Sequence, residues 1–228
     1  MQLQGHVVAI TGAFGALGSA VVRAVLAEGA QVAAIDRAVA PHAPLEGAAL
    51  FGDVDLSSDT GAKSAVDAIV ARFGRVDALV NIAGGFRWET VADGSLATWN
   101  AMFEANLRTA VAACHAVLPH LPDNIGRIIN IGANGAMKAG AGMGAYAASK
   151  SGVARLTEAL AEELKERGIT VNALLPSIID TAANRKDMPK ADFGTWVRPE
   201  QLADVIVFLL SAKSSAITGA LLPVTGRV

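Results

Sequence analysis

Short apolar runs alternate along the chain with longer stretches of amphipathic pattern. Six runs rich in Val, Ile, Leu and Ala read as continuous rather than alternating, which is typical of strands buried on both faces. They are His6–Thr11, Gln31–Asp36, Ala78–Ile82, Arg127–Gly132, Thr170–Leu175 and Ala220–Val224. Helix-like patterns lie between them at Gly18–Glu28, Thr60–Phe73, Trp99–Leu118 and Ser149–Arg167.

Strands and helices in alternation predict an α/β fold: a single-domain, Rossmann-type, doubly wound parallel sheet flanked by helices. The length of 228 residues agrees with one domain spanning residues 1–228. The segment Thr181–Pro199, with its Asn, Lys, Pro and Gly residues, shows no core pattern. Because long irregular segments in compact domains are often lids, we expect residues 181–199 to form a substrate loop.

Charge and composition narrow the classes of partner. Lys and Arg number 19 against 21 Asp and Glu, so no basic face for nucleic acid is indicated. Cys114 is the sole cysteine, which fits a reducing compartment. The start MQLQGHVVAI lacks a signal-peptide pattern, and no run reaches the length of a membrane span. We expect a cytoplasmic protein that binds a small molecule, with no metal site and neither nucleic acid nor membrane as partner.

A glycine-rich turn joins the first expected strand to the first helix. Glycines there permit a tight turn and let backbone N–H groups approach a pyrophosphate at the helix N-terminus. An ordinary strand-to-helix turn can carry the same glycines, but the place in the first strand–helix unit favours dinucleotide binding. The residues expected to contact the cofactor here are Gly12, Phe14, Gly15, Ala16, Leu17 and Gly18.

Asp36 ends the second expected strand, 18 positions after Gly18. A carboxylate at this place accepts hydrogen bonds from an adenosine ribose and repels a 2′-phosphate. The alternative interpretation is a solvated acid at a strand end. Arg37 beside it could bind the phosphate, but the carboxylate should dominate, so we predict NAD(H) in preference to NADP(H). Asp53, after the next strand-like run, is expected near the adenine ring.

Tyr146 and Lys150 lie four residues apart, on one face of a helix that begins near the tyrosine. A phenol titrates near pH ~10, so it needs help to exchange protons near neutrality. We expect Tyr146 to act as general acid and Lys150 to favour the phenolate and hold the nicotinamide ribose. The alternative is a chance Y-x-x-x-K on a helix surface.

With these motifs together, the chain resembles the short-chain dehydrogenase/reductase family over essentially its whole length. The order and spacing match in the glycine turn, Asn81-Ile82-Ala83-Gly84, Asn106, Tyr146 with Lys150, and Pro176 followed by Thr181. The resemblance implies that Asn106 is catalytic and anchors a water in a proton relay to Lys150. It also implies that Asn81, Ala83 and Gly84 shape the cofactor pocket, and that Pro176, the Ile179 backbone and Thr181 hold the carboxamide.

The departures from the family pattern carry information about the substrate. Ala16 stands where the family has glycine, with Gly15 one place early, and Ser177 stands where glycine follows the proline. The family's catalytic serine aligns with Ala133, thirteen residues before Tyr146. That serine donates a hydrogen bond to a carbonyl oxygen. Asn134 could rotate into its place, whereas Ser149 and Ser151 lie on other helix faces.

The dihydropteridine reductase branch of the family is similar in these same departures. It also carries G-x-x-G-A-L-G, A-G-G after the fourth strand, and alanine for the serine. Its tail is similar to the stretch from Leu175-Pro176 through Asp180-Thr181 and Asn184-Arg185-Lys186 to Trp196. The resemblance implies reduction of quinonoid dihydropterin by NADH. Hydride charge then spreads over ring nitrogens, so a donor at position 133 is less necessary, and Ala133 would face the substrate.

Flat heterocycles favour aromatic neighbours, and Phe86, Trp88, Phe193 and Trp196 are the candidates, of which one or two are expected to touch substrate. Two other interpretations stay open: a carbonyl or alcohol oxidoreductase that tolerates the lost serine, and a non-catalytic NAD-binding module. The Ala-rich helices Trp99–Leu118 and Ser149–Leu164 favour a homodimer or homotetramer through helix packing.

Overall fold

A seven-stranded parallel sheet forms the centre of the molecule in the computed structural model, which describes residues 1–228. The strand order is β3-β2-β1-β4-β5-β6-β7, and every neighbouring pair is parallel. The strands are β1 (Val7–Thr11), β2 (Gln31–Ile35), β3 (Ala49–Phe51), β4 (Ala78–Asn81), β5 (Arg127–Ile131), β6 (Thr170–Pro176) and β7 (Leu221–Val224). The predicted fold class is confirmed.

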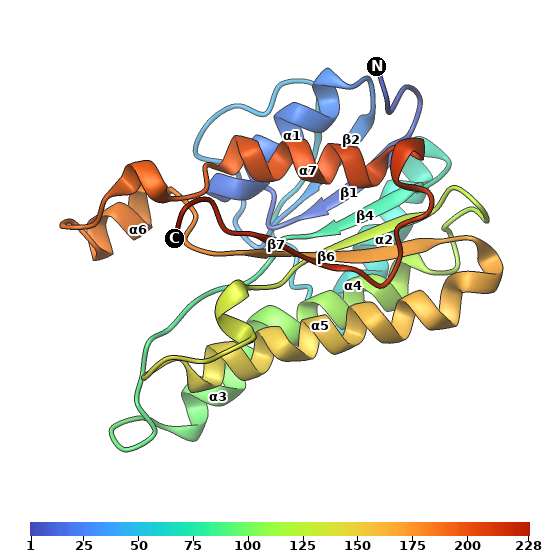
Figure 1. The fold of residues 1–228 in the computed structure, drawn as a ribbon. Coiled ribbons are helices and arrows are strands. Elements are labelled where there is room, and N and C mark those ends of the chain that lie inside the picture. The colour runs from blue at the N-terminus through green and yellow to red at the C-terminus, as the bar shows by residue number, and fades with distance from the viewer.

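Helices cover both faces of the sheet (Figure 1). One face carries α1 (Ala16–Ala27) and α7 (Pro199–Leu210), and the other carries α2 (Asp59–Phe73), α4 (Thr109–Val117) and α5 (Gly144–Leu164). Each face has its own buried cluster of aliphatic side chains, one under α1 and α7 and one under α2, α4 and α5. The continuous apolar pattern of the strands follows from this double cover.

Two helix patterns began too late in the sequence, and one strand was missing from the six expected runs. The three-residue strand β3 was not among the six expected runs. Helix α5 begins at Gly144, so the pattern Ser149–Arg167 starts five residues late, whereas the expectation that the helix begins near Tyr146 is confirmed. The predicted helix Trp99–Leu118 begins earlier, as α3 (Leu96–Phe103), and passes through a π-helical segment (Glu104–Arg108) into α4.

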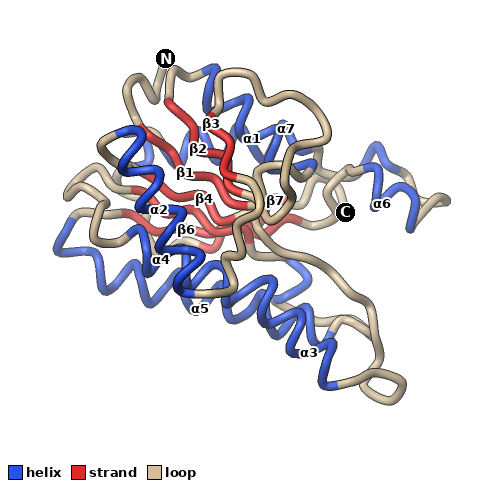
Figure 2. Tube along the Cα trace, turned by 180° about the vertical axis from the view of Figure 1, so that it is seen from behind, coloured by secondary structure: helices blue, strands red, loops and turns tan.

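The segment predicted to lack structure contains α6 (Ala182–Asp187) and a 3-10 turn (Phe193–Thr195). It projects from the body of the molecule, and both views show α6 lying outside the packed layers (Figures 1 and 2). A parallel β-bridge between Ile179 and Val197 ties its two ends together. Further 3-10 turns occupy Asn134–Ala136, Lys165–Arg167 and Ala212–Ser214.

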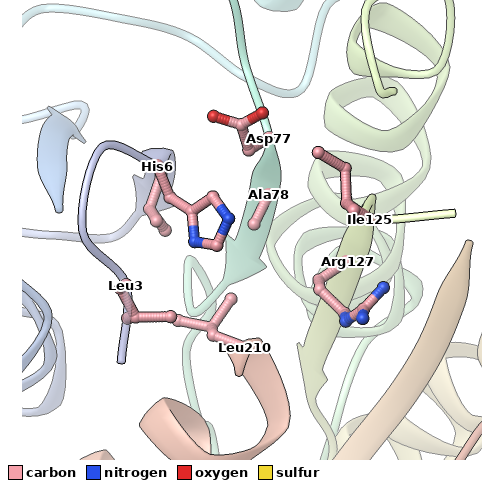
Figure 3. A pocket seen from close by; sticks show the side chains of 8 residues that line it. Leu3, His6, Asp77, Ala78, Ile125, Arg127 and Leu210 are labelled. Atoms are coloured by element: carbon pink, nitrogen blue, oxygen red, sulfur yellow. The ribbon is translucent and has the colours of Figure 1, made fainter. Parts of the chain in front are cut away.

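The order of the strands locates the site. β1 lies between β2 and β4, and the chain reverses its winding direction there, so the carboxyl ends of β1 and β4 form a switch-point crevice. At the opposite, amino ends of β1, β4 and β5, Figure 3 shows a narrow gap beside His6, Asp77 and Arg127, with a volume of about 10 Å³. That volume matches about one water molecule.

No helix of the chain is both long and apolar enough to cross a membrane.

Candidate active site

The glycine-rich turn packs tightly against the loop that follows β4. Gly12 has φ +63°, and a Cβ there would lie 2.7 Å from the backbone nitrogen of Ala83. A Cβ on Gly18 would strike the carbonyl oxygen of Gly12. Helix α1 starts after Gly15, which caps it without a side-chain hydrogen bond. The first N–H groups of α1 are thus left for a ligand, an arrangement that fits a pyrophosphate.

The other residues of the turn differ in which atoms they present. Phe14 and Leu17 are buried in the core beneath α1 and α7, so only their backbone atoms face the turn. Gly15 and Ala16 are exposed. The turn therefore offers backbone donors and one methyl group rather than polar side chains.

Asp36 lies against this turn at the end of β2. Its Oδ2 accepts a hydrogen bond from the Phe14 backbone N–H at 2.9 Å, and its Oδ1 accepts one from the Ala38 N–H at 3.0 Å. The carboxylate is therefore fixed beside the start of α1, with further lone pairs available to ribose hydroxyls. Arg37 is exposed. Asp53 is also exposed, with φ +57°, and its N–H donates to the Ala38 carbonyl at 3.1 Å.

The loop after β4 is held by Thr11, which the sequence motifs did not single out. Its Oγ1 accepts from the backbone N–H groups of Ile82 and Ala83, both at 3.1 Å. The Asn81 side chain is 5% exposed, and its Nδ2 donates to Asn130 Oδ1 at 2.9 Å. Asn81 thus belongs to a buried polar chain between strands, and its expected part in shaping the cofactor pocket stays a prediction.

Tyr146 and Lys150 stand at the N-terminal end of α5, next to the crevice. Lys150 is 6% exposed, its Nζ donates to the Ile131 carbonyl at 2.7 Å, and burial lowers its pKa to about 8. Burial raises the pKa of Tyr146 to about 12. The expected lowering of the Tyr146 pKa by Lys150 is thus wrong for the free chain, because desolvation of the phenol dominates. Tyr146 is a phenol that stays protonated at neutral pH.

Asn106 lies in the π-helical segment, a feature that often accompanies functional sites. Its Oδ1 accepts from the Gly85 N–H at 2.9 Å, and its Nδ2 donates to the Gly85 carbonyl and to Ser149 Oγ, each at 3.0 Å. A Cβ on Gly84 would lie 2.5 Å from Asn106 Oδ1 and 3.4 Å from Lys150 Nζ. The side chains of Asn106 and Lys150 therefore both approach the backbone of Gly84.

Ala133 is 5% exposed and lines a cavity of about 250 Å³ that Lys150 also reaches. The other lining residues are Ala136, Met137, Ser151, Ala154, Arg155 and Leu175. Asn134, half-buried, opens the 3-10 turn that follows. The residue aligned with the missing serine thus presents a methyl group to the same cavity as Lys150.

The predicted aromatic contacts divide into two groups. Phe86 is 56% exposed and meets Tyr146 edge to face, with ring centroids 4.9 Å apart. Trp88 is 60% exposed, and its Nε1 donates to the Ala141 carbonyl at 2.9 Å. Trp196 is only 5% exposed and packs on Phe193 at 4.8 Å. Its expected contact with substrate is therefore wrong in this conformation, because the buried indole packs against Phe193 within residues 181–199.

The residues expected around the carboxamide lie between the end of β6 and α6. Pro176 ends β6 and is buried. Thr181 Oγ1 caps α6 by accepting from the Asn184 N–H at 3.2 Å, and the Ile179 carbonyl accepts from Asn184 Nδ2 at 2.7 Å. These two polar atoms thus already hold α6 in place.

Comparison with known proteins agrees with this geometry. The family model described as "short chain dehydrogenase" matches residues 6–192. The chain is 33% identical to 3-oxoacyl-acyl-carrier-protein reductase FabG of Thermotoga maritima, over 99% of this chain and 98% of that protein. It is also 33% identical to D-threitol dehydrogenase of Mycolicibacterium smegmatis, over 99% and 93% of the two chains.

Solved structures are similar over the whole chain. A short-chain dehydrogenase/reductase from Serratia marcescens has a TM-score of 0.88 at 28% identity, covering 100% of this chain and 99% of that one. A blue fluorescent protein from a metagenomic library, in complex with NADPH, has a TM-score of 0.89 at 31% identity with the same coverage. The chain belongs to the short-chain dehydrogenase family and is an oxidoreductase. The interpretation as a non-catalytic module is therefore wrong.

Proposed function

We propose that this family member uses NADH to reduce a small conjugated substrate, with quinonoid dihydropterin as the best candidate. The observation that carries the proposal is Ala133. A buried methyl group lines the same cavity as Lys150, where a carbonyl reductase of the family is expected to place a hydroxyl donor, while Tyr146 and Lys150 are intact. The site keeps its proton donor and gives up its oxyanion donor.

This combination suits a C=N bond within a conjugated ring. NADH supplies the hydride and is oxidised to NAD⁺. Tyr146 would provide the matching proton to a ring nitrogen, so hydride and proton together add two electrons and two hydrogens to nitrogens of the conjugated C=N system, and no new C–H bond forms. Because the negative charge spreads over several nitrogens, no single oxygen needs a dedicated donor. Lys150 would stabilise the Tyr146 phenolate left by this transfer electrostatically until the phenolate is reprotonated.

The cofactor roles of the residues are part of the proposal. The turn from Gly12 to Gly18 offers backbone N–H groups at the start of α1, and Asp36, fixed by the Phe14 N–H, is positioned to accept from ribose. A 2′-phosphate would meet that carboxylate, which supports NAD(H) over NADP(H). The similar metagenomic protein binds NADPH, which argues against a preference for NAD(H). In this chain, Arg37 is the residue that would favour NADP(H).

The test is the initial rate of NADH oxidation with freshly generated quinonoid dihydropterin. Tyr146→Phe is the matched control, because it removes one oxygen and the proton donor. We expect turnover by the wild type that disappears in the variant. NADH binding without any turnover above the control would reject the pterin substrate.

A second candidate is a carbonyl or alcohol oxidoreductase, which the relatives named as FabG, D-threitol dehydrogenase and meso-2,3-butanediol dehydrogenase favour. In this case the missing donor limits the rate. Ala133→Ser should then raise turnover of a simple ketone or an acyl thioester by orders of magnitude. Under the pterin proposal the same substitution leaves pterin turnover within a few-fold of the wild type.

We also propose that the chain assembles as a homodimer or homotetramer through α3, the π segment and α4. Leu96, Phe103 and Val111 are 82%, 54% and 43% exposed. Their spacing of seven and eight residues puts them on one helical stripe, and an apolar stripe of this kind marks an interface. Light scattering at micromolar concentration tests this, and a monomer would contradict it.

We also place the protein in the cytoplasm, which cell fractionation tests. We propose that residues 181–199 form the substrate lid, which limited proteolysis with and without ligand tests.

A further inference from the structure

Ser149 links two parts of the site that are far apart in the sequence. The residue is 2% exposed, and its hydroxyl donates to the Tyr146 carbonyl at 2.7 Å while accepting from Asn106 Nδ2 at 3.0 Å. Its donor and acceptor capacities are both used. The π segment is thereby joined to the first turn of α5.

Asn106 connects Ser149 to the loop after β4. Its side-chain amide makes two hydrogen bonds to Gly85: it accepts from the N–H at 2.9 Å and donates to the carbonyl at 3.0 Å. A paired amide contact fixes both the position and the orientation of the peptide. The residue that follows Gly85 is Phe86.

The Phe86 ring packs against the ring of Tyr146. Its ring meets the tyrosine ring at an interplanar angle of 81°, edge to face, although Phe86 itself is 56% exposed. An aromatic side chain this exposed has little packing to hold it, and one edge-to-face contact holds a ring only weakly. The backbone at Gly85 therefore decides where the ring lies.

We propose that Ser149 and Asn106 are positioning residues that hold Phe86 against the phenol of Tyr146 and so keep the proton donor shielded from water. The contacts form a closed chain: Ser149 binds Asn106, Asn106 binds Gly85, and Phe86, which follows Gly85, packs on Tyr146. Tyr146 is joined to Ser149 again through α5.

The electrostatic surroundings of Tyr146 agree with a shielding role. Burial is the cause of the raised pKa of Tyr146, with no charged group contributing. Lys150 is the titratable group that follows on α5, and the loop side presents Gly85 and Phe86, which carry no charge. Opening the loop should therefore lower the pKa of Tyr146 toward that of a free phenol.

The chain offers a direct measurement, because Tyr146 is its only tyrosine. The near-ultraviolet absorbance of phenolate therefore reports on this residue alone, with no substrate and no assumption about the reaction catalysed. A pKa of about 12 leaves roughly 1% phenolate at about pH 10, where an ordinary phenol is about half ionised. We expect Ser149→Ala and Phe86→Leu each to raise this fraction to roughly 10% or more.

A double-mutant cycle identifies the route. If Ser149 acts through Phe86, the variant carrying both substitutions should match Phe86→Leu alone, whereas independent effects would add. Ser151→Ala is the control, because Ser151 flanks Lys150 on the other side and donates to the Ala136 carbonyl at 3.0 Å. It should leave the titration unchanged. Ser149→Thr, which retains the hydroxyl, should restore the wild-type titration.

Several outcomes would overturn the proposal. A wild-type titration in Phe86→Leu, an exposed position where folding is safe, would show that the ring does not shield Tyr146. A wild-type titration in Ser149→Ala, or additivity in the double variant, would show that Ser149 does not act through the loop. If Ser149→Ala does not fold, Ser149→Thr and Phe86→Leu decide the matter. Because the readout needs no substrate, failure of the pterin proposal leaves this test intact.

Discussion

Replacing Lys150 by methionine should stabilise the protein at neutral pH while it abolishes activity. The ammonium is 6% exposed with one carbonyl partner, and burial lowers its pKa from 10.5 to about 8. At about 1.4 kcal/mol for each pKa unit, the charged form is disfavoured by about 3 kcal/mol in the folded chain. Methionine keeps a similar length and carries no charge to desolvate.

The sign of the pH effect follows from proton counting. Between about pH 8 and 10.5 the unfolded chain keeps the Lys150 proton that the folded chain has released, so the free energy of unfolding rises with pH. From about pH 7 to about pH 9 this contributes about 1 kcal/mol of stability to the wild type and nothing to Lys150→Met. Tyr146 stays protonated in both states over most of this range, because its pKa is raised to about 12.

Urea unfolding at about pH 7 and about pH 9 measures the effect, as the difference in free energy between the variant and the wild type. That difference should shrink by about 1 kcal/mol on raising the pH. Lys63→Met is the control, because the Lys63 side chain is 71% exposed in its pair with Asp67. A difference that stays constant with pH for Lys150→Met would show that Lys150 is not desolvated in the folded chain, and the reasoning would fail.

Three further outcomes are expected. Asp36→Asn removes the charge that would face a 2′-phosphate, and should raise NADPH affinity relative to NADH at least about tenfold, or about 1.4 kcal/mol, by fluorescence titration. Gly142→Ala puts a Cβ into the Trp88 ring at φ +74°, and should lower the free energy of unfolding by about 1 to 3 kcal/mol and alter Trp fluorescence. Turnover by the wild type in the reducing direction should fall above about pH 8, as Lys150 loses its charge, and a rate constant up to about pH 10 would contradict this.

Much of the fold can be predicted because hydrophobic pattern and sheet architecture agree. The six predicted runs became strands because helices bury both faces of a parallel sheet. β3 was noticed only as a strand-like run before Asp53 and was not counted among the six, since it has three residues, of which only Ala49 is buried. The hydrophobic pattern marked α5 only from Ser149, because its N-cap Met143 makes no side-chain hydrogen bond that would signal the start. The start of α3 did carry a signal: Ser95 caps it by accepting from the Thr98 N–H.

In the candidate site, too, local features could be predicted from the sequence and long-range contacts could not. Spacing along one helix was enough to put Tyr146 beside Lys150. Spacing could not reveal that Ser149 binds Asn106, 43 residues away, or that Asn106 grips Gly85, 21 residues away, because such contacts depend on how the elements pack. Nor could it show that Tyr146 is desolvated, since the ring that covers it comes from another loop.

The shielded phenol and the alanine at position 133 belong to one chemical argument. A tyrosine with a raised pKa is a weak acid, and it gives up its proton readily only to a group that becomes strongly basic during the reaction. An alkoxide held by a serine hydroxyl is made less basic by that hydrogen bond. Ala133 offers no such bond, so the group that forms keeps its full basicity and must take its proton from Tyr146. A substrate whose charge is spread over ring nitrogens does not need the donor at position 133, but it is a weaker base than an alkoxide and therefore draws the proton from a shielded Tyr146 less strongly. The donor at position 133 and the water exclusion around Tyr146 are therefore best varied together, in Ala133→Ser and Phe86→Leu, when substrates are compared.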